Sequence, residues 1–141
     1  MARRFFAFLC VAVLAGAASA QRPPQPPPLS GIELLRSEFA VQSGGSVVYF
    51  PLGSNQLSQH ARTVLVAQAR WIRQHPEIVV RIEGHADGGD TRDHALAVGA
   101  RRAQEVRDYL VMLGVPSTQV TAMSWGKEHP GPGRVATILV R

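Results

Sequence analysis

Residues 78–115 read IVVRIEGHADGGDTRDHALAVGARRAQEVRDYLVMLGV, and their pattern predicts most of the fold around them. Apolar and polar side chains alternate over 78–83, which indicates a strand with one face on a core. A polar, glycine-rich loop is expected over 84–93. Apolar positions then recur at steps of three and four, at Leu96, Gly99, Ala103, Val106, Leu110 and Leu113. This spacing predicts a long helix that ends at Gly114.

The segments on either side continue the alternation of strands and helices. A second helix is predicted between a cap at Ser58 and a stop at Pro76. Short runs rich in β-branched and aromatic residues predict three further strands, over 46–50, 120–125 and 135–140. The apolar points of 30–41 fit a short helix without requiring one, so this segment stays open. The order β-α-β-α-β-β predicts an α/β (α+β) two-layer sandwich.

The first twenty residues have the composition of a cleaved Sec signal peptide. The three parts are an arginine pair at 3–4, an apolar run at 5–14 and a small-x-small cleavage pattern at 18–20. Cys10 is the only cysteine of the sequence, and Leu9 stands before it where a lipoprotein site requires a small residue. We therefore expect an exported, periplasmic protein without a lipid anchor, whose mature chain begins at Gln21 and carries no cysteine.

Composition narrows the class of protein further. Of the 141 residues, 45% are hydrophobic and 18% charged, which fits a globular domain with a core. The formal charge of +5 falls to +3 without Arg3 and Arg4, since 13 basic residues then face 10 acidic ones. This bias is too mild to indicate a nucleic-acid partner. Residues 22–28 (RPPQPPP) favour a semi-rigid tether over a proline-motif ligand, and the absence of a heptad seam predicts a monomer.

The loop after the 78–83 strand gathers titratable side chains, namely His85, Asp87, Asp90, Asp93 and His94. One interpretation is a metal-dependent hydrolase in which His85, Asp87 and His94 are ligands, although their spacing matches no tight metal motif. A second interpretation is a solvated loop, with an acidic residue or Thr91 capping the helix that follows. For Asp90 and Asp93 we favour this second interpretation.

A third interpretation is a site for a zwitterion. Asp87 ends the strand, and Arg102 lies fifteen residues further on, in the predicted helix. The carboxylate could accept an ammonium group, while the guanidinium could hold a carboxylate with two parallel hydrogen bonds. The spacing alone does not decide among the three interpretations.

Residues 46–141 resemble the OmpA-like peptidoglycan-binding domain, and most of all its peptidoglycan-associated lipoprotein branch. The resemblance rests on motifs in order: VVYF at 47–50, VRIEGHAD at 80–87, GARRAQEVRDYLVMLGV at 99–115 and SWGKEHP at 124–130. It implies a mixed four-stranded sheet with two main helices on one face. It also divides the chain into a signal peptide (1–20), a proline-rich linker and N-terminal segment (21–45) and an OmpA-like domain (46–141).

The resemblance implies a non-catalytic protein, without metal or cofactor, that binds peptidoglycan and stabilises the envelope near the outer membrane. Asp87 and Arg102 match the residues that hold the ammonium and carboxylate of meso-diaminopimelate in the stem peptide. Four more residues are expected to support the site: Gly84, His85, His94 and Arg134. Of these, His85 is expected to hold the loop rather than touch the ligand. Tol-type or other envelope proteins are candidate further partners.

The chain departs from the family pattern at four places, and one of them is Pro51, which stands where the family has an acidic residue after the first strand. Asp90 stands where the family has glycine, His-Ala at 94–95 replaces Tyr-Asn, and Val135 replaces an arginine in a shortened loop. Each lost charged hydrogen bond costs about 1.5–3 kcal/mol, which predicts weakened wall binding. The alternative is a domain that keeps the fold and binds a protein instead. Arg101, next to Arg102, is expected to be a solvated surface charge.

Overall fold

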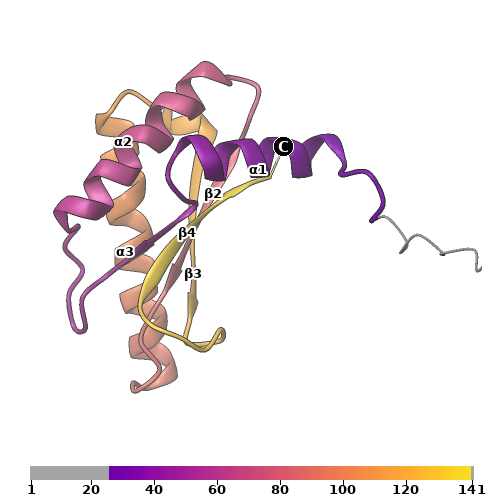
Figure 1. The fold of residues 1–141 in the computed structure, drawn as a ribbon. Helices are drawn as coiled ribbons and strands as arrows, with labels where there is room; N and C mark the ends of the chain where they lie inside the picture. The colour runs from indigo at the N-terminus through magenta and orange to yellow at the C-terminus, as the bar shows by residue number, and fades with distance from the viewer. Residues whose placement is uncertain (1–25, 141) are drawn as a thin grey trace, which may run out of the picture.

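The computed structural model describes residues 26–140 (Figure 1), so the predicted signal peptide and part of the proline-rich segment lie outside the described residues. In chain order the elements are α1 (Gly31–Gln42), β1 (Val47–Tyr49), α2 (Gln59–Gln74), β2 (Val80–His85), α3 (Arg92–Met112), a 3₁₀ turn (Ser117–Gln119), β3 (Val120–Gly126) and β4 (Arg134–Leu139). The expected α+β architecture is confirmed. Helix α1 is a third helix, which precedes the other elements in the chain.

The four strands form one mixed sheet in the order β1-β4-β2-β3. Strand β2 is central, parallel to β3 and antiparallel to β4. Its first residue pairs with Leu139, and its last, His85, pairs with Arg134. Helices α2 and α3 cover one face of the sheet (Figure 1), as the resemblance implies.

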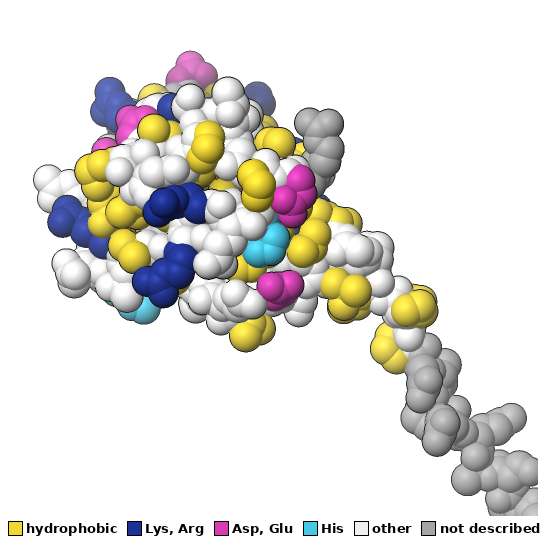
Figure 2. All heavy atoms as spheres, turned by 90° about the horizontal axis from the view of Figure 1, so that it is seen from above, with side chains coloured by type: hydrophobic (Ala, Val, Ile, Leu, Met, Phe, Trp, Pro, Cys, Tyr) yellow, Lys and Arg dark blue, Asp and Glu magenta, His cyan; other side chains and the backbone are white. Residues whose placement is uncertain are grey.

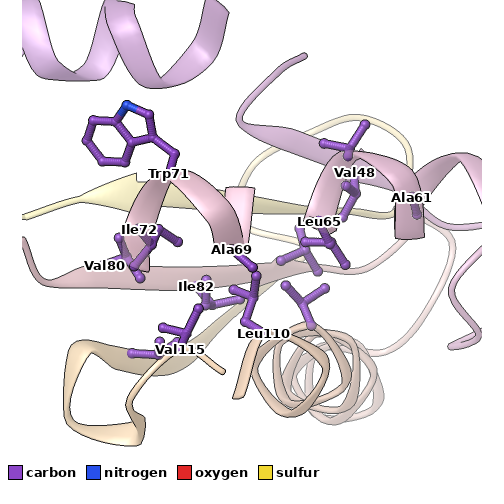
Figure 3. Packing of buried hydrophobic residues seen from close by; sticks show 14 of the residues in the cluster. Val48, Ala61, Leu65, Ala69, Trp71, Ile72, Val80, Ile82, Leu110 and Val115 are labelled. Atoms are coloured by element: carbon purple, nitrogen blue, oxygen red, sulfur yellow. The ribbon is translucent and has the colours of Figure 1, made fainter. Parts of the chain in front are cut away.

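The core fills the space between that face and the helices. Ile78, Val80 and Ile82 are at most 3% exposed, which confirms the alternation read from the sequence. Figure 3 shows Ile82 of β2, Ala69 of α2 and Leu110 of α3 pointing toward one another between the two layers. The apolar stripes of both helices therefore face the sheet, as their periodicity predicts.

Local capping explains where the two main helices begin and end. The Ser58 hydroxyl accepts a hydrogen bond from Ala61 N at 3.1 Å and starts α2, as predicted. Thr91, rather than Asp90 or Asp93, is the N-cap of α3. After α3, Gly114 adopts φ +97°, a left-handed conformation that glycine adopts readily and that ends helices.

Strand β2 continues further than the sequence predicts. A loop was expected from Gly84, because glycines and polar residues cluster there, but the strand runs through His85. Gly84 stays in the ladder because its backbone hydrogen bonds need no side chain, and its missing Cβ lets α3 approach. A Cβ at Gly84 would lie only 1.9 Å from the carbonyl oxygen of Gly99.

The segment that the sequence left undecided forms a helix, α1. Phe39 is 1% exposed and packs edge-on against Trp71 of α2, with ring centroids 5.1 Å apart. Arg36 donates to the carbonyl oxygen of Leu139 at 2.9 Å, at the end of β4. The packed unit thus begins before residue 46, while the predicted division of the chain there stays a prediction.

Two further properties concern the surface of the described residues. None of the helices within 26–140 is both long and apolar enough to cross a membrane. On the face shown in Figure 2, arginine and lysine side chains are interspersed with apolar and acidic ones. No continuous basic stripe is visible on that face.

Candidate functional site

A pocket of about 520 Å³ lies where α3 begins, between the β2–α3 loop and the loop that follows β1. Its lining residues come from three segments: Leu52, Gly53 and Asn55; Ala86, Asp87, Gly89 and Asp90; and His94, Val98, Arg101 and Arg102. Three of the predicted site residues, Asp87, Arg102 and His94, are among them. The structure thus brings together the carboxylate and the arginine that the sequence singled out.

Arg102 is wholly buried at the floor of this pocket. Its Nε and Nη2 donate to the carbonyl oxygen of Ser54 at 3.1 and 3.0 Å, and Nη1 donates to that of His85 at 3.1 Å. Nη2 also donates to Asp87 Oδ2 at 3.1 Å, and the guanidinium carbon lies 5.3 Å from the centre of the Phe50 ring. Arg102 is therefore no ordinary surface arginine of a helix.

Asp87 is the partly exposed member of the pair, with 27% of its side chain accessible. Its Oδ1 accepts a hydrogen bond from the backbone of Gly133 at 2.8 Å. Partial burial disfavours the charged carboxylate, but this bond and the Arg102 guanidinium outweigh it and lower the pKa of Asp87. The pocket therefore presents a carboxylate that stays ionised at neutral pH.

His94 and Asp90 are two exposed residues of the pocket lining. The His94 ring pairs with the Asp90 carboxylate one helical turn earlier, and Lys127 donates to the backbone carbonyl of Asp90. The hydrogen bond from His94 and the nearby positive charges lower the pKa of Asp90. Asp90 is thus an ionised, hydrogen-bonded loop residue beside the N-cap, close to the solvated interpretation favoured from the sequence.

The other three expected residues lie outside the pocket lining. The carbonyl of His85 contacts Arg102, whereas its imidazole packs edge-on against His129 with ring centroids 5.5 Å apart. Arg134 pairs with His85 across the sheet and donates to the carbonyl of Pro132 at 3.1 Å. Gly84 lies under α3. All three residues therefore lie near the site but not in the pocket lining.

Two contributors to the site escaped sequence reasoning. Ser54 holds Arg102 through a backbone carbonyl, which every residue type possesses, so no single-sequence signal could reveal it. Gly133 binds Asp87 through its N–H, and a Cβ there would lie 2.0 Å from Arg102 Nη1. In the sequence, the only indication of this contact is the glycine-rich, shortened loop before β4.

The metal interpretation finds no support in the geometry. Within residues 26–140, no three His, Cys, Asp or Glu side chains come together as a metal-ligand set. His94 pairs with Asp90, and the His85 ring packs on His129. The hydrolase built on His85, Asp87 and His94 therefore lacks the cluster that it needs.

The buried His85 imidazole leads us to expect a less stable fold at acid pH. It is 4% exposed, and its Nδ1 has no hydrogen-bond partner among the described residues. Desolvation first, then electrostatic interactions with Arg134 and His129, lower the pKa of His85, against the smaller opposing effect of Glu83. The unfolded chain, with an ordinary pKa near about 6.5, therefore binds the proton more readily.

We therefore expect the contribution of neutral His85 to the free energy of unfolding to be complete above about pH 6.5. This contribution should be lost as the pH falls through the folded-state pKa of His85. Urea titrations between about pH 7.5 and about pH 5 measure the free energy of unfolding over that window. His85→Gln should flatten the dependence, whereas His60→Gln, at an exposed position of α2, should leave it intact. Equal slopes for wild type and His85→Gln would show that another group controls it.

This chain is similar to known proteins in sequence and in structure. The OmpA family profile matches residues 49–134. The peptidoglycan-associated lipoprotein of Mesorhizobium japonicum is 41% identical over 93 residues, or 66% of this chain and 55% of that protein. The Rhizobium meliloti protein of that name is 41% identical over 95 residues, covering 67% and 53%. The chain thus matches about half the length of these relatives.

A solved structure extends the similarity to three dimensions. The crystal structure of the peptidoglycan-associated lipoprotein from Burkholderia pseudomallei has a TM-score of 0.66 and 30% sequence identity. The similarity covers 69% of this chain and 92% of that one. The family match runs from the last residue of β1 to the first residue of β4 and includes the whole pocket lining, so this chain belongs to the OmpA family.

Proposed function

We propose that this protein is a non-catalytic, periplasmic binder of peptidoglycan that links or stabilises the cell envelope. The observation that carries the proposal is an ionised, partly exposed carboxylate, Asp87, fixed by buried Arg102 at the floor of a pocket. The relatives are named peptidoglycan-associated lipoproteins, which supports the same ligand class. Export through the leader at 1–20 and further envelope-protein partners belong to the proposal.

Within the stem peptide, the diaminopimelate side chain suits this pocket because its end carries an ammonium and a carboxylate on one carbon. Asp87 accepts the ammonium, as the third interpretation of the sequence expects. A direct contact of Arg102 with the ligand carboxylate has to compete with the protein acceptors that Arg102 already has.

The test is co-sedimentation of the full-length protein with purified sacculi. Asp87→Asn keeps the shape of the side chain and an acceptor for Gly133 N–H but removes the charge, so affinity should fall by roughly ten- to a hundred-fold. Asp93→Asn, at an exposed position in the first turn of α3, is the matched control and should bind like wild type.

Two results would contradict the proposal. If the wild-type protein stays in the supernatant, it does not bind the wall, and the alternative of a protein-binding OmpA-like domain is favoured. If Asp87→Asn sediments as wild type does, wall binding stands but its site lies elsewhere.

A further inference from the structure

A second cavity, of about 260 Å³, lies between α1 and the end of β4, which Figure 1 shows side by side. We call it the α1–β4 cavity, and its lining residues are Arg36, Phe39, Ser46, Thr137, Ile138 and Leu139. Leu139 pairs with the first residue of β2, whereas the Asp87 pocket follows the last. The two cavities therefore lie toward opposite ends of β2, and they share no lining residue.

The walls of the α1–β4 cavity are mostly hydrocarbon. Phe39 of α1 and Ile138 of β4 supply apolar side chains, and the Thr137 hydroxyl already has an acceptor in the core at 2.8 Å. Arg36 is the only charged residue of the lining. Apolar walls with one cation suit a ligand that combines an apolar group with a negative charge.

Arg36 has a free hydrogen-bond donor at this cavity. Its Nε and Nη2 both donate to the carbonyl oxygen of Leu139, at 3.2 and 2.9 Å. Nη1 has no acceptor within residues 26–140, and no acidic side chain of that range lies within ion-pair distance of the guanidinium. A carbonyl leaves the positive charge of Arg36 uncompensated. A carboxylate can therefore bind Nη1 without displacing a protein contact.

The backbone of Leu139 supplies a second donor. Along β4, the N–H of Thr137 donates to the carbonyl of Ser46 at 2.8 Å, on the side of β1. The N–H of Val140 donates to the carbonyl of Val79 at 2.9 Å, on the side of β2. The two sides alternate along an antiparallel strand, so the N–H and carbonyl of Leu139 point to the side of β1.

Strand β1 does not extend as far as Leu139. It begins at Val47, opposite Ala136, so β4 continues past it. The Leu139 carbonyl receives Arg36, but no acceptor for the Leu139 N–H is found on that side among the described residues. Leu139 is 1% exposed, and a buried N–H without an acceptor costs free energy. A ligand that supplies an acceptor at this position is therefore favoured.

We propose that the α1–β4 cavity binds the C-terminal residue of an extended peptide whose last side chain is aliphatic. The carboxylate accepts from Arg36 Nη1 and from the Leu139 N–H, and the side chain lies against Phe39 and Ile138. The peptide continues the sheet where β1 stops, which is the strand-addition mode of peptide recognition. This inference goes beyond the proposed function and does not depend on it.

The open edge of β4 favours a peptide over a lipid carboxylate. Both ligands supply a negative charge and an apolar chain, but only a peptide presents backbone groups that pair along a strand edge. The experiment therefore compares three probes. They are the N-acetylated peptide Ser-Val-Thr-Leu with a free C-terminal carboxylate, the same peptide with a C-terminal amide, and decanoate.

NMR titration of the isotope-labelled full-length protein measures the binding of each probe. The free-acid peptide should shift the backbone amide signals of Ser46 and Leu139. The Leu139 signal should move downfield, because its N–H gains an acceptor. Conversion of the carboxylate to the amide removes a charge-assisted hydrogen bond, so affinity should fall by roughly ten-fold or more. Decanoate should bind more weakly than the free-acid peptide.

Arg36→Gln should abolish most of the preference for the free carboxylate, whereas Arg36→Lys should keep part of it because the charge remains. Arg36 is exposed, so both variants should fold. The indole N–H signal of Trp71, which packs against Phe39, reports whether α1 stays in place. Arg62→Gln, at an exposed position of α2 outside the cavity lining, is the matched control and should behave as wild type.

Three results would overturn the inference. If both peptides bind equally, Arg36 does not recognise the carboxylate. If millimolar free-acid peptide shifts no signal at Ser46 and Leu139, or only signals around Asp87, the cavity is not a peptide site. If decanoate binds more tightly than the peptide, the occupant is a lipid carboxylate. Co-sedimentation with sacculi tests the Asp87 pocket, so the proposed function and this inference can fail independently.

Discussion

Replacing Arg102 by methionine should destabilise the protein by about 3–5 kcal/mol, because it removes one partner of a buried ion pair. Methionine keeps much of the volume, so the loss reflects hydrogen bonds rather than a cavity. The carbonyls of Ser54 and His85 lose their donor, and Asp87 loses its counter-ion. Partial exposure of Asp87 places the expected cost toward the lower end of this range.

Arg101→Met is the internal control, since it makes the same chemical change one position earlier on the same helix. Arg101 is exposed, so its replacement should change the free energy of unfolding by no more than about 0.5 kcal/mol. Urea denaturation measures both variants, and thermal melts should show a fall in Tm of roughly 10 °C or more for Arg102→Met. Equal stability of the two variants would mean that the buried network contributes little.

Gly84→Ala should be similarly severe for a steric reason. The added Cβ would lie 1.9 Å from the Gly99 carbonyl oxygen and 2.8 Å from its carbon, so the obstacle is backbone. Ordinary overpacking costs about 1–3 kcal/mol, and here β2 and α3 must separate, which places the cost at or above the upper end. The separation also displaces Asp87 from Arg102, because each lies three residues beyond one of the two glycines.

Gly88→Ala provides the comparison for this prediction. Gly88 lies four residues further along the same segment, and a Cβ there would meet nothing within 4 Å. Its stability should therefore stay within about 0.5 kcal/mol of wild type. Denaturation of the two alanine variants under identical conditions decides the point, and a Gly84→Ala protein as stable as Gly88→Ala would disprove the close approach.

Periodicity predicted the main elements because their packing is regular. The Ser58 cap and the apolar stripes of α2 and α3 are local signals, and the structure places them as expected. The sequence underestimated β2, because Gly84 resembles a loop residue until its contact with Gly99 is known. The sequence left α1 undecided. The contact that holds this helix, Phe39 against Trp71, joins residues that are more than thirty positions apart in the chain.

The pocket could be predicted only in part. The resemblance identified Asp87 and Arg102, and the structure brings them to 3.1 Å. It could not show that Arg102 is buried, since its depth depends on backbone carbonyls of a distant loop and on the missing side chain of Gly133. The pocket-facing position of Arg101 was likewise hidden, because two adjacent arginines look equivalent in a sequence.

The pocket and helix α1 lie at opposite ends of strand β2. The Asp87 pocket follows the end of β2, where His85 pairs with Arg134. Helix α1, through Arg36, is fastened to Leu139, whose partner Val80 begins β2. Under the proposed function, a pull between a ligand in the pocket and the N-terminal segment would act along the strands. Such a pull would load the inter-strand hydrogen bonds of β2 and β4 together instead of opening them one at a time.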